Sequence, residues 1–247
     1  MPFSDAEVER YARHLVLKEI GGPGQQALKA ARVLIVGVGG LGAPAALYLA
    51  AAGVGHIGLA DGDTVALSNL QRQVLFAAAD VGKAKTAAGA ERLTALNPHV
   101  EVVAHPAMLA ADNAAEIITG YDLVLDGTDD FETRFVINAA CVALGKPLIS
   151  GALGRWSGQV GVFHGQPCYQ CYVSETPPDA ETCAVVGVVG ALAGMIGAAM
   201  ALEAIKLITG AGRPLIGRLL MYDGLNAETR VSRIGADPNC PVCGDRR

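Results

Sequence analysis

Two pairs of cysteines are the residues whose type and spacing point most directly to chemistry. Cys168 and Cys171 form one CxxC pair, and Cys240 and Cys243 form a second pair far along the chain. Four thiolates with this spacing are typical of a tetrahedral zinc site that has no open position for water or substrate. We therefore expect a structural Zn²⁺ that ties the C-terminal part of the chain to the loop after strand 158–164.

Redox motifs or free thiols are the alternatives for these cysteines. A thioredoxin-type CxxC begins a helix directly after a strand. The sequence predicts neither pair in such a place, which favours zinc.

A glycine-rich segment forms the second chemical motif, with Gly37, Gly39, Gly40 and Gly42 in the spacing GxGxxG. It lies between an apolar run at 32–36 and a predicted helix at 41–52, and Asp61 ends the next predicted strand. In this context the glycines let phosphates approach the backbone, and the carboxylate can accept hydrogen bonds from ribose hydroxyls. The pattern alone is also typical of an NAD-dependent oxidoreductase, and a tight turn that only packs a helix on a strand is a further alternative.

Cations that follow Asp61 favour a triphosphate over a dinucleotide. Arg72 and Lys85 can grip phosphate oxygens and stabilise the charge on departing pyrophosphate. Ordinary surface positions are the alternative for Arg72, and for Lys83 they are the favoured interpretation. These residues indicate a nucleoside triphosphate.

Two adjacent carboxylates, Asp129 and Asp130, follow the predicted strand 123–126. Open α/β sheets bind ligands at the carboxyl ends of their strands, and carboxylates there can hold a Mg²⁺ that bridges phosphates. A carboxylate directly before a helix can instead cap it. We expect Asp129 to face the metal and Asp130 to lie at the start of the helix 130–144.

The remaining two cysteines differ in their surroundings. Cys141 falls within an apolar helical stretch and is predicted to be inert. Cys183 follows a polar, proline-containing loop, where exposure near a helix start would favour the thiolate. A reactive role and an ordinary loop cysteine are both open for Cys183. The five histidines are scattered, and we assign them no catalytic role.

These motifs require an alternation of buried strands and helices that positions them. The pattern predicts strands at 32–37, 56–60, 100–104, 123–126 and 147–150, with helices at 5–18, 41–52, 82–96, 112–119 and 130–144. The segment Gly21–Gly24 is predicted to break the chain. Such alternation implies right-handed βαβ crossovers and a Rossmann-like, open, mostly parallel sheet. Strands at 158–164, 218–222 and 230–234, with an apolar helix at about 185–208, are expected to extend it in antiparallel fashion.

Composition limits the classes of partner. The net charge of −5 and the scarcity of aromatic residues argue against nucleic acid. The first residues carry acidic side chains and no apolar core, unlike a secretion signal. The uncharged stretch 182–202 is long enough to cross a bilayer but rich in glycine, so a core or dimer-interface helix is preferred. We expect a cytoplasmic protein with no membrane partner.

Taken together, the motifs resemble the ubiquitin-activating-enzyme-like superfamily, and most closely its MoeB/ThiF/HesA branch. The resemblance covers nearly the whole chain. It rests on residues 10–13, the glycine loop, Asp61, Lys85, residues 128–129, residues 182–183, both CxxC pairs and, most specifically, the string Ser68, Asn69, Leu70, Gln71, Arg72 and Gln73.

This resemblance implies an enzyme that binds ATP and Mg²⁺ and adenylates the C-terminal glycine of a ubiquitin-like sulfur-carrier protein. It places Gly40, Asp61, Asn69, Arg72, Lys85 and Asp129 around ATP. Arg13 is implied to reach the phosphates of the neighbouring subunit, so a homodimer is expected, which becomes a heterotetramer with the carrier. At Asp130 the chain departs from the family, in which many members have asparagine. A thioester or persulfide at Cys183 is implied by some members only.

The resemblance also suggests how the chain is organised and which carrier it serves. A single unit of 1–247 is expected, with an N-terminal helical segment at 1–30, a nucleotide-binding half at 31–151 and a carrier-binding and zinc half at 152–247. The carrier of molybdopterin synthesis is preferred, and the thiamine carrier is the alternative. Because the chain ends soon after Cys243, a separate sulfur donor is expected. A docking module without chemistry is the remaining alternative.

Overall fold

The protein is built on one eight-stranded sheet with the order β3-β2-β1-β4-β5-β6-β7-β8. The structure, a computed structural model, describes residues 2–176 and 187–244. The parallel part consists of β1 (Arg32–Val36), β2 (His56–Ala60), β3 (Glu101–His105), β4 (Leu123–Asp126) and β5 (Leu148–Leu153). Antiparallel pairing adds β6 (Ser157–Phe163), β7 (Arg218–Asp223) and β8 (Glu228–Arg233). The predicted fold class, mostly parallel with an antiparallel extension, is confirmed.

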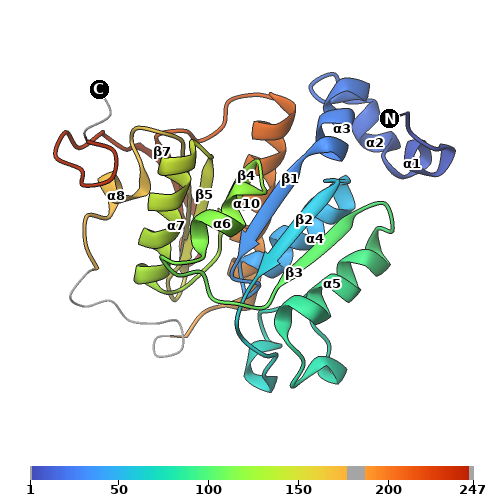
Figure 1. The fold of residues 1–247 in the computed structure, drawn as a ribbon, viewed down its shortest axis with the longest axis horizontal. Helices are drawn as coiled ribbons and strands as arrows, with labels where there is room; N and C mark the ends of the chain where they lie inside the picture. The colour runs from blue at the N-terminus through green and yellow to red at the C-terminus, as the bar shows by residue number, and fades with distance from the viewer. Residues whose placement is uncertain (1, 177–186, 245–247) are drawn as a thin grey trace.

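Helices cover both faces of the parallel strands (Figure 1). One face carries α3 (Gly21–Ala30), α4 (Gly42–Ala52), α5 (Lys85–Leu96) and α10 (Gly190–Thr209) over the larger core cluster. The other face carries α6 (Ala114–Thr119), α7 (Phe131–Leu144) and the short α8 (Tyr169–Tyr172). The central strands are buried on both sides, and for this reason they read as continuous apolar runs in the sequence.

The strand order reverses between β1 and β4, and this reversal fixes where a ligand can bind. β1 pairs in parallel with β2 on one side and with β4 on the other. The connections that leave the carboxyl ends of β1 and β4 therefore run to opposite sides and leave a crevice between them. The glycine segment follows β1, and the acidic turn follows β4.

The long apolar helix α10 lies against the sheet. By length and composition alone it could cross a membrane, and 44% of its apolar window is buried inside the protein. Leu192, Ile196 and Met200 pack into the larger core cluster, and Gly197 lies directly against the backbone of Leu41. The prediction of a core helix is confirmed for this face, whereas Met195 and Leu202 remain exposed on the other face.

Two predictions about the N-terminal segment were wrong in detail. The capping box of Ser4 and Glu7 is present, but the helix divides at Tyr11 into α1 (Asp5–Arg10) and α2 (Ala12–Leu15). The Tyr11 ring is buried against Gly53, and its hydroxyl oxygen accepts a hydrogen bond from Asn97 Nδ2 (2.9 Å). This long-range contact turns the chain. Gly21–Gly24 does not break the chain but forms the first turn of α3, where proline is tolerated.

The remaining irregular elements lie between β2 and α5. Two short 3₁₀ helices, η1 (Leu67–Asn69) and η2 (Ala78–Asp80), occupy the segment that carries the specific string 68–73. Helix α5 begins at Lys85 rather than at Gly82, because Thr64 and Ala84 form a β-bridge just before it. This bridge brings the start of α5 back beside the end of β2.

Candidate nucleotide site and four-cysteine centre

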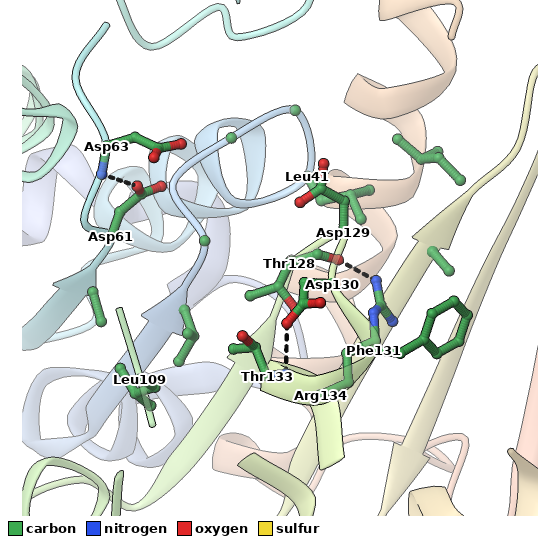
Figure 2. Close-up of a pocket in the computed structure, with 18 of the residues that line it drawn as sticks. Leu41, Asp61, Asp63, Leu109, Thr128, Asp129, Asp130, Phe131, Thr133 and Arg134 are labelled. Carbon is green, nitrogen blue, oxygen red and sulfur yellow. Dashed lines mark hydrogen bonds between the residues drawn. The ribbon is translucent and has the colours of Figure 1, made fainter. Parts of the chain in front are cut away.

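A cavity of about 450 Å³ opens at the carboxyl ends of β1, β2 and β4, where the strand order reverses. Figure 2 shows Asp61 and Asp63 on one side of it and Asp129 and Asp130 on the other. Most residues predicted for the nucleotide site line it: Gly37, Gly39, Gly40, Asp61, Asn69, Arg72, Lys85, Asp129 and Asp130. Segments that are separated in sequence therefore meet in one place.

The glycine segment makes a tight turn between β1 and α4. Gly37 has φ +80°, and a Cβ there would lie 3.0 Å from the backbone of Gly127. A Cβ at Gly42 would lie 2.0 Å from Gly37 O, so Gly42 closes the turn and does not line the cavity. Gly39 and Gly40 face the cavity, and they leave the backbone open to a close ligand.

Acidic and basic groups meet at the end of β2. Asp61 accepts hydrogen bonds from the backbone N–H of Val38 (2.8 Å) and of Asp63 (2.9 Å). Lys85 Nζ lies 2.7 Å from Asp63 Oδ2 and 3.8 Å from Asp61 Oδ2. Burial raises the pKa of Asp61 above its ordinary value, and the backbone donors and Lys85 offset only part of this rise. The cluster therefore holds a buried cation at the start of α5, beside the glycine turn.

Lys83 and Lys85 differ as the sequence suggested. The Lys83 side chain is exposed and pairs with Asp80 (2.9 Å) and Glu91 (3.6 Å) on the surface. Lys85 is buried and lines the cavity. Only Lys85 of these two is placed to contact a ligand.

The string 68–73 contributes some of its residues to the cavity. Arg72 lines it, and its Nη1 donates to Ser68 O (3.0 Å). Asn69 also lines it, while its Oδ1 accepts from Ala66 N (3.2 Å). Three residues of the string that were predicted for the site do not line the cavity, namely Ser68, Leu70 and Gln71. Leu70 packs on the core, and Gln71 O lies against Gly190 at the start of α10.

The two adjacent carboxylates after β4 point in different directions (Figure 2). Asp130 is the N-cap of α7 and accepts from Thr133 N at 2.7 Å. Although burial opposes it, this hydrogen bonding holds the pKa of Asp130 below its ordinary value. Asp129 is exposed and lines the cavity. The predicted helix-capping position of Asp130 is confirmed, and Asp129 is left available for a ligand.

A buried ion pair supports the turn that carries Asp129. Arg134 Nη1 lies 3.6 Å from Asp126 Oδ2, and the side chains of both residues are almost fully buried. Arg134 also donates to the backbone oxygens of Gly151 (2.8 Å) and Thr128 and to Ser150 Oγ (3.1 Å). The guanidinium therefore joins the end of β4 to the middle of β5. Sequence reasoning missed this residue.

Other lining residues were also missed. Gln73 is 4% exposed, and its Oε1 has no hydrogen-bond partner among the described residues. Its place in the string 68–73 was the available signal. Gln159, Tyr169 and Tyr172 line the end of the cavity nearest the cysteines, and Tyr172 Oη donates to Gln159 Oε1 (3.1 Å). No sequence pattern marked this end.

The four predicted metal ligands come together on the α7 side of the sheet. All four Sγ atoms lie within 4.8 Å of one another, with Cys168–Cys240 at 3.5 Å and Cys171–Cys243 at 3.4 Å. Zn–S bonds of about 2.3 Å in a tetrahedron place sulfurs about 3.8 Å apart. The donor set therefore fits Zn²⁺. One expectation was wrong, because Cys168 is the N-cap of the short helix α8, which follows β6.

Three further predicted residues lie elsewhere. Arg13 is exposed on α2, near the end at which β2 begins, and it does not line the cavity of its own chain (Figure 1). Cys141 is buried in α7, and burial raises its pKa to about 12, as expected of an inert thiol. Cys183 lies outside the described residues.

Comparison with known proteins agrees with this geometry. The ThiF family model matches residues 11–242. The sulfur carrier protein adenylyltransferase of Thermus thermophilus is 47% identical over 99% of the chain and 94% of its own length. The molybdopterin-synthase adenylyltransferase of Escherichia coli is 45% identical over 98% of both.

Some relatives are longer, and a solved structure has the same fold. The chain spans 50% to 63% of several relatives described as adenylyltransferases and sulfurtransferases. The crystal structure of E. coli MccB with ATP has a TM-score of 0.80 at 25% identity and covers 90% of this chain and 70% of that one. Because the family model matches residues 11–242 and a relative is 47% identical over 99% of the chain, the chain belongs to the ThiF family.

Proposed function

We propose that this protein uses ATP to adenylate the C-terminal carboxylate of a sulfur-carrier protein and releases pyrophosphate. The observation that carries the proposal is 47% sequence identity, over nearly the full length of both chains, to a sulfur carrier protein adenylyltransferase. The cavity adds independent support, because the glycine turn, Arg72, Lys85 and Asp129 line one space. An NAD-dependent oxidoreductase would leave both cations and the four-cysteine centre without a role.

The proposed chemistry depends on positioning and charge. A carboxylate is already ionised at neutral pH, so its oxygen attacks the α-phosphorus without a general base, and the bond to pyrophosphate breaks. Arg72 and Lys85 are assigned to the phosphates, where they stabilise the leaving charge. The backbone at Gly39 and Gly40 approaches the phosphates, and Asp61 accepts from the ribose.

Metal ions have two separate roles in the proposal. Asp129 is assigned to Mg²⁺, because its carboxylate lines the cavity and is not used to cap α7. When bound, the ion neutralises charge on the phosphates. Zn²⁺ is assigned to the four cysteines as a structural ion. A four-cysteine zinc site also supports a cytoplasmic location, because thiols stay reduced there.

We infer that the working form is a homodimer in which Arg13 completes the partner's site. In its own chain Arg13 lies near the beginning of β2, whereas the cavity lies at the opposite ends of the strands. Exposed Tyr48 on α4 and exposed Met195 and Leu202 on α10 give an apolar surface for a second copy. A mixture of Arg13→Ala and Lys85→Ala chains should then regain about a quarter of the native sites by random pairing. No recovery in the mixture would contradict the shared site.

The identity of the carrier is proposed from what a relative acts on. We propose the small subunit of molybdopterin synthase, because a molybdopterin-synthase adenylyltransferase matches over 98% of both chains. The thiamine sulfur carrier remains the alternative.

ATP–pyrophosphate exchange tests the reaction and the carrier together. Purified protein is given ATP, Mg²⁺ and labelled pyrophosphate with each candidate carrier in turn. Label should move from pyrophosphate into ATP when the molybdopterin carrier is present. Lys85→Ala should lose about 10²–10³-fold in rate, as expected for removal of one charge-stabilising donor. Lys83→Ala is the matched control and should keep full activity. Exchange with the thiamine carrier alone would change the pathway, and ATP binding without any exchange would favour a docking role.

A further inference from the structure

Asn138 connects the four-cysteine centre to the cavity. Helix α7 has its N-cap, Asp130, beside the cavity, and it carries Arg134 one turn after the cap and Asn138 after another turn. Asn138 is 1% exposed, its Oδ1 accepts from Tyr169 N (2.9 Å), and its Nδ2 donates to Cys168 Sγ (3.6 Å). A single amide side chain therefore holds a metal ligand and the residue that follows it.

The residues that directly follow Cys168 and Cys171 form one wall of the cavity. Tyr169 and Tyr172 are the first and last residues of α8, which lies beside α7 (Figure 1). The Tyr169 ring packs edge-on against Phe163, with centroids 5.5 Å apart, and is 3% exposed. Tyr172 reaches Gln159 in β6 by its hydroxyl. A change at Cys168 or Cys171 must therefore move residues that line the cavity.

The opposite end of the cavity is built independently of the cysteines. Gly39, Gly40 and Asp61 lie on the connections that follow β1 and β2, and Lys85 begins α5. Their hydrogen bonds and ion pairs run among these segments. Loss of the metal should therefore disturb one end of the cavity and spare the other.

We propose that Asn138 is a positioning residue through which the metal centre fixes Tyr169 and Tyr172 at the cavity end away from the glycine turn. That this end receives the C-terminus of the carrier rests on the proposed function. Hydrogen bonds to metal ligands fix their orientation, and their loss typically costs about 10–100-fold in metal affinity or activity. The amide of Asn138 applies the same constraint to the backbone of α8.

Asn138→Ala and Asn97→Ala form a matched pair for the test. Both side chains are buried and held by hydrogen bonds, two for Asn138 and three for Asn97. Asn97 donates to Tyr11 Oη and Ala50 O near the N-terminal segment and accepts from His99 N. Release of Zn²⁺ to a chromogenic chelator should be about 10–100-fold faster in Asn138→Ala and unchanged in Asn97→Ala. Equal release rates in the two variants would overturn the proposal.

Fluorotyrosine labelling reports on the cavity wall without turnover. The ¹⁹F resonances of Tyr169 and Tyr172, assigned with Tyr→Phe variants, should shift in Asn138→Ala and on removal of Zn²⁺ from the native protein. The resonance of Tyr48, exposed on α4, should not shift. Unmoved Tyr169 and Tyr172 resonances after metal removal would contradict the coupling.

A second variant keeps the test decisive if the alanine variant does not fold. Asn138→Asp retains the acceptor for Tyr169 N but replaces the donor to Cys168. It should therefore release Zn²⁺ faster than the native protein, and it should shift the ¹⁹F resonance of Tyr169 less than Asn138→Ala does. With the carrier, the KM for the carrier should rise in Asn138→Ala while calorimetric ATP affinity stays the same. If no carrier supports exchange, the metal-release and ¹⁹F results still test the positioning role separately from the proposed function.

Discussion

Replacement of Arg134 by methionine removes the cation of the buried ion pair between Arg134 and Asp126. Asp126 is 0% exposed and would keep its carboxylate without a counter-ion. Although burial disfavours the charged guanidinium, Asp126 holds the pKa of Arg134 above its ordinary value. The replacement therefore breaks a buried ion pair.

The size of the effect follows from what remains around Asp126. Breaking a buried pair costs about 3–5 kcal/mol. Asp126 keeps donors from Thr128 N (3.0 Å), Thr128 Oγ1 (2.6 Å) and Ser150 Oγ (2.9 Å), which places the cost at the lower end of this range. A loss of about 3 kcal/mol corresponds to roughly 6–12 °C in Tm for a chain of this size.

Urea unfolding, followed by circular dichroism and by the fluorescence of Trp156, measures the free energy of unfolding. Coincidence of the two probes would justify a two-state treatment. The double variant Arg134→Met with Asp126→Asn should lose less than the sum of the single variants, by about 1–3 kcal/mol. Arg92→Met, at an exposed position of α5, is the control and should stay within about 0.5 kcal/mol.

The same substitution should weaken binding of ATP with Mg²⁺. Thr128 O loses the donor that holds the turn before Asp129, so the carboxylate is less well positioned. Calorimetry with ATP and Mg²⁺ measures this affinity. A cost in unfolding free energy below about 1 kcal/mol, or strict additivity with Asp126→Asn, would refute the electrostatic argument.

Three further predictions concern metal, pH and thiol chemistry. Removal of Zn²⁺ by a chelator should lower Tm by several degrees while ATP affinity changes little, and an unaltered Tm would contradict the structural role. Burial alone would raise the pKa of Glu7, but hydrogen bonds from Lys29 and Ser4 hold it at about 2 against an ordinary 4.5. Because a depressed pKa contributes stability above 4.5 that is lost as pH falls toward 2, the urea midpoints of native protein and Glu7→Gln should differ at pH 7 and converge below about pH 4.5. A gap that stays constant to pH 3 would exclude this linkage, and Glu9→Gln is the exposed control. Alkylation followed by peptide mass spectrometry should label Cys183 before Cys141, and the reverse order would argue against a reactive Cys183.

Local patterns determined the larger part of the fold. Buried parallel strands such as β1 and β4 appear as short apolar runs, because both of their faces are covered by helices. Turn and cap chemistry is also local, so the glycine turn after β1 and the cap at Asp130 could be placed within a residue or two. The cysteine spacing likewise indicated the four-ligand centre, since thiolate pairs at this separation suit one ion.

Contacts between distant segments caused the errors at the N-terminus. Tyr11 interrupts the first helix because it packs at Gly53 and Asn97, and neither partner is visible in a window of neighbouring residues. The start of α5 at Lys85 depends in the same way on a bridge to Thr64.

By itself, the sequence determined which residues could carry the chemistry, because glycine turns, cations, paired carboxylates and cysteine pairs have local signatures. Only the tertiary structure decided which of them share a space. It buried Lys85 and left Lys83 on the surface, and it joined Arg134 on α7 to Asp126 at the end of β4. It also placed Asn138 between a cysteine ligand and the cavity wall. These pairings depend on how helices dock on the sheet, and docking is set by packing over the whole core rather than by any short segment.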